Sequence, residues 1–148
     1  MVLGLIGLGD MGFSLAQELI RNKITVVAYD HLPTHRRKAA DNGIVTTSSV
    51  QAVLLHLPKK RIVFCVLESV TETQQIYLQI QPLLEHADIL VNIGFKSANN
   101  QLFKTSHVLD ISIEDKTIEC TGSELAYHIC KPIFETIANG KTINHHYR

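Results

Sequence analysis

Three glycines near the amino terminus have the residue type and spacing that bind a phosphate. The motif G-x-G-x-x-G reads Gly7-Leu8-Gly9-Asp10-Met11-Gly12. In this pattern the first glycine permits a tight turn, the second lets a diphosphate approach the backbone, and the third allows close helix–strand packing. The free N–H groups at the start of the following helix, aided by its dipole, then meet the anion. The motif therefore predicts a site for the diphosphate of a dinucleotide.

A carboxylate follows at the separation that ribose recognition requires. Asp30 comes about 20 residues after the glycine motif, at the end of the β-branched run 24–29. We expect its carboxylate to accept hydrogen bonds from the adenosine ribose hydroxyls and to repel a 2′-phosphate, so NAD is favoured over NADP. Side chains that partly offset this repulsion lie close by: His31, His35, Arg36 and Arg37.

Apolar runs alternate with amphipathic stretches along the chain, and they set the elements that position these residues. We expect strands at 2–6, 24–29, 61–67, 89–93, 108–113 and 117–120. We expect helices at 11–22, 33–42, 49–57 (capped by Ser48 or Ser49), 71–84, 97–105 and 123–138. This rhythm predicts a Rossmann-type, doubly wound, mostly parallel sheet between two helical layers, a three-layer α/β/α fold. Residues 1–138 form this domain, and residues 139–148 are a polar tail that we expect to fray.

The composition excludes several classes of function. The chain has 14 basic and 14 acidic residues, so it lacks the positive charge that nucleic acid binding requires. No apolar run reaches the roughly 18 residues of a membrane span. Cys65, Cys120 and Cys130 have no C-x-x-C spacing, and we interpret them as reduced, buried thiols of a cytoplasmic protein.

The sequence also resembles a known family. The run 1–12 is similar to the start of the 6-phosphogluconate dehydrogenase and β-hydroxyacid dehydrogenase superfamily. Segments that resemble its 6-phosphogluconate branch are Tyr29-Asp30, 57–63, 83–89 and 126–138. The Tyr29-Asp30 ending is similar to that of the NAD-preferring members. The resemblance implies an NAD(P)-binding domain in which Leu67 lies in the turn along the cofactor, where the family has Val-Pro.

The sequence departs from this family on the substrate side. The family takes a lysine base from a second, helical domain, which we expect to be absent here. Phe95 stands where an asparagine near the nicotinamide is expected, and the Ser-Gly-Gly substrate loop after Asp110 is replaced by residues 111–117. Glu68 follows Leu67 and faces the expected crevice, where its charge weakens cofactor affinity. We therefore assign no catalytic residue and expect cofactor binding without independent turnover.

Several interpretations stay open from the sequence alone. The first is an NAD-binding domain of 6-phosphogluconate dehydrogenase type. Such a domain is either a remnant or half of a split dehydrogenase that a partner chain completes, and self-association through the last strand or helix is the alternative to such a partner. The second is a non-catalytic module that senses a dinucleotide or contacts proteins. The third is a truncated piece of a longer enzyme, and the altered substrate loop argues against it. No metal site is expected, since His145 and His146 lack a third ligand.

Overall fold

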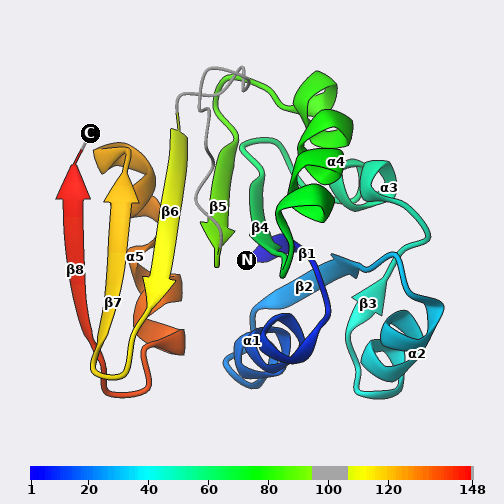
Figure 1. Ribbon diagram of the computed structural model, residues 1–148, viewed down its shortest axis with the longest axis horizontal. Helices are drawn as coiled ribbons and strands as arrows, with labels where there is room; N and C mark the ends of the chain where they lie inside the picture. Colours follow the sequence, from blue (N-terminus) through cyan, green and yellow to red (C-terminus); the bar gives the residue numbers. More distant parts are fainter. Residues whose placement is uncertain (95–106, 148) are drawn as a thin grey trace.

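A computed structural model of the chain describes residues 1–94 and 107–147 (Figure 1). Phe95, Lys96 and the helix expected at 97–105 lie outside the described residues. The strands are β1 (Val2–Ile6), β2 (Thr25–Tyr29), β3 (Val45–Thr46), β4 (Ile62–Val66), β5 (Ile89–Ile93), β6 (His107–Ile113), β7 (Thr117–Gly122) and β8 (Thr142–Tyr147). The helices are α1 (Asp10–Arg21), α2 (Pro33–Asp41), α3 (Val50–Leu55), α4 (Val70–Ile80), the 3-10 segment η1 (Gln81–Leu83) and α5 (Glu124–Ile137).

The strands form one sheet in the order β3-β2-β1-β4-β5-β6-β7-β8. All neighbouring pairs are parallel except β6 and β7, which are antiparallel. The chain winds outward from β1 in one direction through β2 and β3, then returns to place β4 on its other side. This topology confirms the predicted doubly wound, mostly parallel sheet. Between β1 and β4 the strand order reverses, and crevices that bind ligands form at such points, outside the carboxyl ends of the strands.

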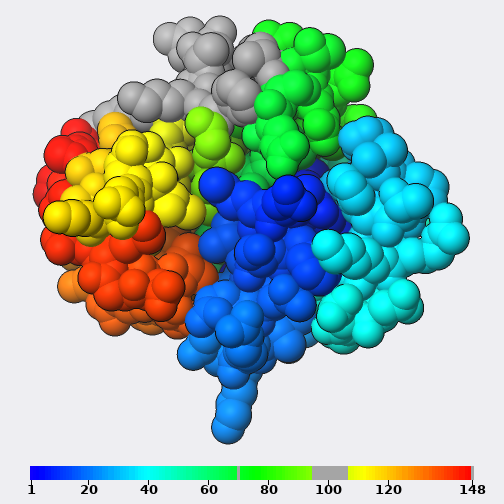
Figure 2. All heavy atoms as spheres, turned by 60° about the horizontal axis from the view of Figure 1, so that its bottom comes forward, coloured from blue at the N-terminus to red at the C-terminus, as the bar shows by residue number. Residues whose placement is uncertain are grey.

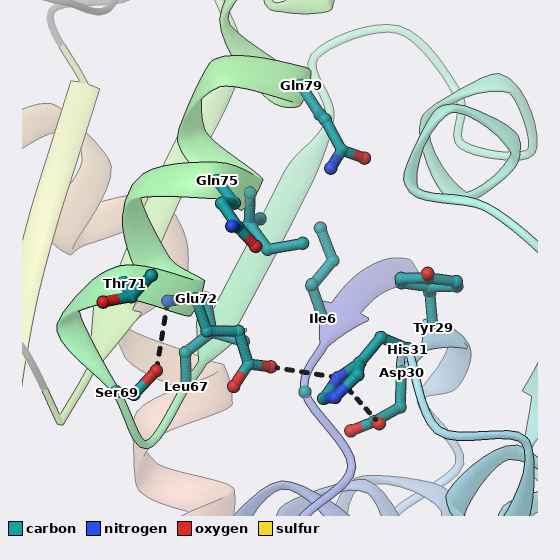
Figure 3. A pocket seen from close by; sticks show the side chains of 12 residues that line it. Ile6, Tyr29, Asp30, His31, Leu67, Ser69, Thr71, Glu72, Gln75 and Gln79 are labelled. Atoms are coloured by element: carbon teal, nitrogen blue, oxygen red, sulfur yellow. Dashed lines mark hydrogen bonds and ion pairs between the residues drawn. The ribbon is translucent and has the colours of Figure 1, made fainter.

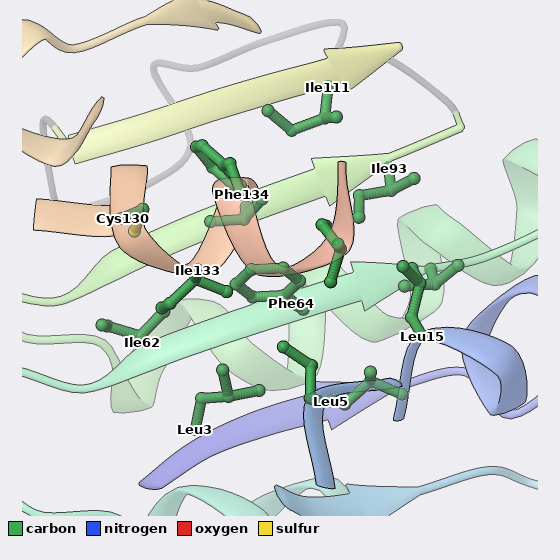
Figure 4. Close-up of a cluster of buried hydrophobic side chains, with 14 of the residues drawn as sticks. Leu3, Leu5, Leu15, Ile62, Phe64, Ile93, Ile111, Cys130, Ile133 and Phe134 are labelled. Carbon is green, nitrogen blue, oxygen red and sulfur yellow. The ribbon is translucent and has the colours of Figure 1, made fainter. Parts of the chain in front are cut away.

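Two apolar cores hold helices against the two faces of the sheet. One core joins α1 and α5 to the sheet, and Figure 2 shows the blue α1 region beside the orange carboxyl-terminal elements. At its centre the rings of Phe64 and Phe134 are 6.3 Å apart (Figure 4). The second core joins α3 and α4 to the opposite face through side chains such as Val53 and Ile80. Because β4 and β5 are buried along their whole length, their apolar runs were recognisable in the sequence.

Serine side chains cap the amino-terminal ends of three helices. Ser49, rather than Ser48, accepts a hydrogen bond from the third backbone N–H of its helix at 3.1 Å. Ser69 and Ser123 make the same contact at the starts of α4 and α5, at 3.0 and 3.2 Å. These side chains satisfy donors that have no partner within the helix, and they fix where each helix leaves its loop.

The expectation of a fraying tail after residue 138 is wrong. Strand β8 pairs with β7 over six positions, from Thr117 opposite Thr142 to Gly122 opposite Tyr147. On one face the ring of His145 stacks on Tyr127 of α5, with 3.9 Å between centroids. The polar composition concealed an alternating pattern in which His145 stacks on α5 and Ile143, two positions earlier, packs against the core that contains α5.

Two smaller differences have local causes. The helix expected at 71–84 ends at Ile80 and continues as η1, where Pro82 occupies the second position. Proline lacks the N–H that would continue the α-helical hydrogen bonds. Strand β3 was not expected, because its two residues are too few to show a sequence period.

Candidate functional site

The glycine loop connects β1 to α1 at the reversal of strand order. Gly7 has a φ of +107°, and its N–H donates to the carbonyl of Tyr29 at 2.9 Å. A Cβ at Gly7 would lie 2.0 Å from the carbonyl oxygen of Val66, and one at Gly12 would lie 1.8 Å from that of Gly7. Both positions therefore require glycine, one for its backbone conformation and both for close packing.

Gly9 is different, because the atom above it belongs to a flexible side chain. It precedes the first residue of α1 and makes no side-chain cap. A Cβ there would lie 2.6 Å from Oε1 of Glu68, whose side chain is exposed. The backbone at the start of α1 can therefore receive a phosphate once Glu68 turns away. Asp10 and Met11 are exposed in the same first turn, where the N–H groups have no partner within the helix.

Asp30 is buried at the end of β2 and holds the glycine loop in place. Its Oδ2 accepts the N–H of Leu8 at 2.7 Å, and its Oδ1 accepts the N–H of Leu32 at 2.9 Å. The side chain of Leu8 packs in the core, so this residue offers the site only its backbone. A carboxylate has about four lone-pair sites, so Asp30 keeps acceptor capacity for a ribose.

A cavity of about 340 Å³ lies between the ends of β1 and β2 and helix α4 (Figure 3). Leu67 and Ile76 form apolar walls, and Tyr29, Gln75 and Glu72 add polar groups. Its size is within the range of small-molecule sites, about 300–1,000 Å³. A second hollow of about 120 Å³ lies over Gly7 and Gly9, and Gly7, Asp30, His31 and Glu72 line both.

A histidine links the two carboxylates at the rim of this cavity. Nδ1 of His31 lies 3.5 Å from Oδ1 of Asp30 and 3.5 Å from Oε1 of Glu72 (Figure 3). Nδ1 of His35 lies 3.2 Å from the same Asp30 oxygen. Sequence reasoning placed the histidines here but missed Glu72 and Gln75. The signal was available, since polar residues at 72, 75 and 79 share one face of a helix.

The polar groups on the far side of the sheet reversal are engaged with one another. Tyr77 of α4 donates to the side-chain oxygen of Asn92, and the Asn92 amide donates to Asp110 at 3.2 Å. Asn92 and Asp110 are 1% and 4% exposed. Burial, with lesser contributions from Cys65 and Asp110, raises the pKa of Tyr77, so its hydroxyl stays protonated and remains a donor. Beside them lies a smaller hollow of about 130 Å³.

The described residues contain neither a metal-binding cluster nor a membrane-spanning helix. Residues 1–94 and 107–147 contain no group of three His, Cys, Asp or Glu side chains arranged to hold a metal ion. Among the helices that the structure describes, none combines the length and apolarity needed to cross a bilayer.

The glycine loop and both hollows lie where Rossmann-type domains bind dinucleotides, at the carboxyl edge beside the strand reversal. The chain is thus a Rossmann-type α/β domain. Residues 2–106 match the family described as the NAD binding domain of 6-phosphogluconate dehydrogenase, and the chain belongs to this family. This match confirms the predicted superfamily. It also confirms the predicted class of cofactor, a nicotinamide dinucleotide.

Solved structures with the same fold are distant in sequence. An imine reductase from Pseudomonas sp. superposes with a TM-score of 0.80 at 16% identity, and the match covers 98% of this chain and 55% of the reductase chain. The 3-hydroxyisobutyrate dehydrogenase of Mycobacterium tuberculosis, solved with L-serine, gives 0.78 at 17% identity, with coverages of 99% and 54%. Prephenate dehydrogenase from A. aeolicus, in complex with hydroxyphenyl propionate and NAD+, gives 0.74 at 20% identity, with coverages of 100% and 59%. The chain therefore spans little more than half the length of these structures. No protein of curated function matches its sequence.

Proposed function

We propose that this chain binds NAD across the two joined hollows. The adenosine lies in the larger cavity against Leu67, and the diphosphate lies on the backbone of residues 7–12. The observation that carries the proposal is that the two hollows adjoin, because Gly7, Asp30, His31 and Glu72 line both. A ligand with a nucleoside joined to a phosphate bridge matches this shape.

The charges around the ribose support NAD over NADP. Asp30 and Glu72 place two carboxylates beside the larger cavity. The Arg36 guanidinium is directed at backbone oxygens rather than at these carboxylates. Its Nη1 donates to the carbonyl oxygens of Asp30 at 2.7 Å and His31 at 3.2 Å. A 2′-phosphate would meet two like charges there, whereas ribose hydroxyls would meet acceptors.

Calorimetric titration of NAD and NADP into the purified chain tests this proposal. We expect NAD to bind more tightly than NADP, and Gly9→Val to abolish binding by filling the space above the loop backbone. Glu135→Gln, on the exposed surface of α5, is the matched control and should bind as the wild type does. Equal binding by Gly9→Val and wild type would exclude the glycine loop as the diphosphate site.

We further propose that the chain, by itself, binds the cofactor without turning over a substrate. Bound nicotinamide supplies a hydride acceptor or donor. General acid–base catalysis also needs a positioned proton carrier. Among the described residues near the ends of β5 and β6, Asn92 and Asp110 are buried and bonded to each other, and Tyr77 donates to Asn92. The measurement is NADH absorbance with NAD and 6-phosphogluconate, and formation at an ordinary enzymatic rate would refute this part.

A cytoplasmic location and an association with another chain complete the proposal. The three cysteines are free and buried, which supports a reducing compartment. Among the described strands, β8 is the last in the sheet, and its outer edge of six residues pairs with none of them, which supports self-association or pairing with a partner chain. Sedimentation analysis over a range of concentrations would detect such an association.

A further inference from the structure

Resting on the proposed function, we infer that the site takes adenine nucleosides and mononucleotides about as well as it takes NAD, because Glu68 occupies the diphosphate position. The larger cavity recognises the nucleoside, and the carboxylate over Gly9 opposes the phosphate bridge. The ligand class is therefore adenosine and the nucleotides that contain it, with NAD as one member.

The position of Glu68 follows from the sheet. It comes two residues after the end of β4, and β4 is the parallel neighbour of β1. Both strands end at the same edge, so the residues that follow β4 lie beside the glycine loop. As a result, Oε1 of Glu68 is 2.6 Å from where a Cβ on Gly9 would be. The carboxylate therefore stands in the space that a diphosphate on this loop requires.

The hollow over the glycine loop is negatively charged. Three carboxylates line it, from Asp30, Glu68 and Glu72, and no lysine or arginine is among the described residues that do so. Its basic groups are the imidazoles of His31 and His35, and both already lie within 3.5 Å of Asp30. A diphosphate entering this hollow would displace one carboxylate and remain near two others.

The larger cavity is separate from this obstacle. Glu68 does not line it, and its walls carry apolar and amide groups, among them Leu67, Ile76, Gln75 and Gln79. Asp30 and Glu72 are the carboxylates at its rim, and each lies 3.5 Å from Nδ1 of His31. A neutral nucleoside therefore meets no charge penalty, while the diphosphate of NAD does. Removing the charge of Glu68 should change the affinity for NAD and leave that for adenosine unchanged.

The experiment is a calorimetric titration of adenosine, AMP and NAD into wild type, Glu68→Gln, Glu68→Ala and the control Glu135→Gln. The side chain of Glu68 is exposed, so we expect the variants to fold, and thermal unfolding verifies this. In the wild type and the control, adenosine and NAD should bind within about threefold of each other. Glu68→Gln should tighten NAD about tenfold by removing like-charge repulsion, and adenosine should change less than twofold.

Each other outcome has a defined meaning. If NAD binds wild type at least tenfold more tightly than adenosine does, or if neither Glu68 variant tightens NAD, the inference is wrong while the proposed function stands. If Glu68→Ala alone tightens NAD, the side chain obstructs by its bulk, and the inference holds. If no ligand binds any variant, the proposed function and the inference both fail.

Discussion

Two glycine-to-alanine substitutions three residues apart should separate the packing role of the loop from its binding role. Gly12→Ala introduces a Cβ 1.8 Å from the carbonyl oxygen of Gly7. Gly7 cannot retreat, because its N–H is bonded to Tyr29 and its own α-carbon faces the carbonyl of Val66. Gly9→Ala introduces a Cβ that meets only the end of the Glu68 side chain, which can rotate.

The expected magnitudes differ accordingly. Overpacking costs about 1–3 kcal/mol in a packed region, and alanine recovers about 1 kcal/mol of helix propensity. Because the Gly12→Ala contact is with fixed backbone, we expect a net loss of about 2 kcal/mol. This lowers Tm by about 4–8 °C for a chain of this size. Gly9 has a φ of −64°, which alanine adopts without strain. Replacing Gly9 as the amino-terminal cap of α1 should lower the free energy of unfolding by about 0.5–1 kcal/mol, which lowers Tm by about 1–4 °C.

The assay is thermal and urea unfolding of both variants without ligand, followed by calorimetric titration of NAD. Both should weaken NAD binding, but only Gly12→Ala should lose substantial stability. Equal stability of Gly12→Ala and Gly9→Ala, or NAD binding by Gly9→Ala equal to that of the wild type, would refute these separate roles.

Three further substitutions test the surrounding structure. Asp30 accepts two backbone N–H groups, one on each carboxylate oxygen, whereas Asp30→Asn leaves a single acceptor oxygen. In unfolding experiments, the free energy of unfolding should therefore fall by about 1–3 kcal/mol. The preference for NAD over NADP should also decrease. Tyr77→Phe leaves a buried acceptor on Asn92 without this donor, so it should cost about 1–3 kcal/mol in urea unfolding without changing NAD affinity. Burial lowers the pKa of His145 in the folded state. As pH falls below about 6.5, this imidazole therefore takes up a proton in the unfolded state before it does so in the folded state, and the free energy of unfolding decreases. His145→Phe preserves stacking on Tyr127, and the drop in urea midpoint between pH 7 and pH 5 should become smaller; an unchanged drop would contradict this assignment.

The sequence was most informative where one residue type serves one physical requirement. The strand at 89–93 was predicted residue for residue, because all five of its positions are buried and all but Asn92 are apolar. The glycine motif was equally clear, since Gly7 and Gly12 face backbone atoms that exclude any side chain. Strand β8 escaped prediction because its alternation is formed by polar and aromatic residues, whose packing on α5 depends on tertiary contacts.

The site was predicted in part for a related reason. A carboxylate at the end of the second strand was expected, but its bonds to the N–H groups of Leu8 and Leu32 were not. Leu8 and Asp30 are 22 residues apart, and their contact depends on the register between β1 and β2. The contribution of α4 to the cavity likewise depends on how that helix crosses the sheet, which local sequence patterns do not determine.

The central claim is that a dinucleotide lies on the glycine loop with its adenosine between β2 and α4. The most direct measurement is a ¹H–¹⁵N NMR titration of the labelled chain with NAD. The account predicts that the amide signals that move most belong to residues 7–12, Asp30 and 67–79, and that those of β8 stay fixed. Saturable shifts confined to β6 and β7, or no shifts at millimolar NAD, would contradict it.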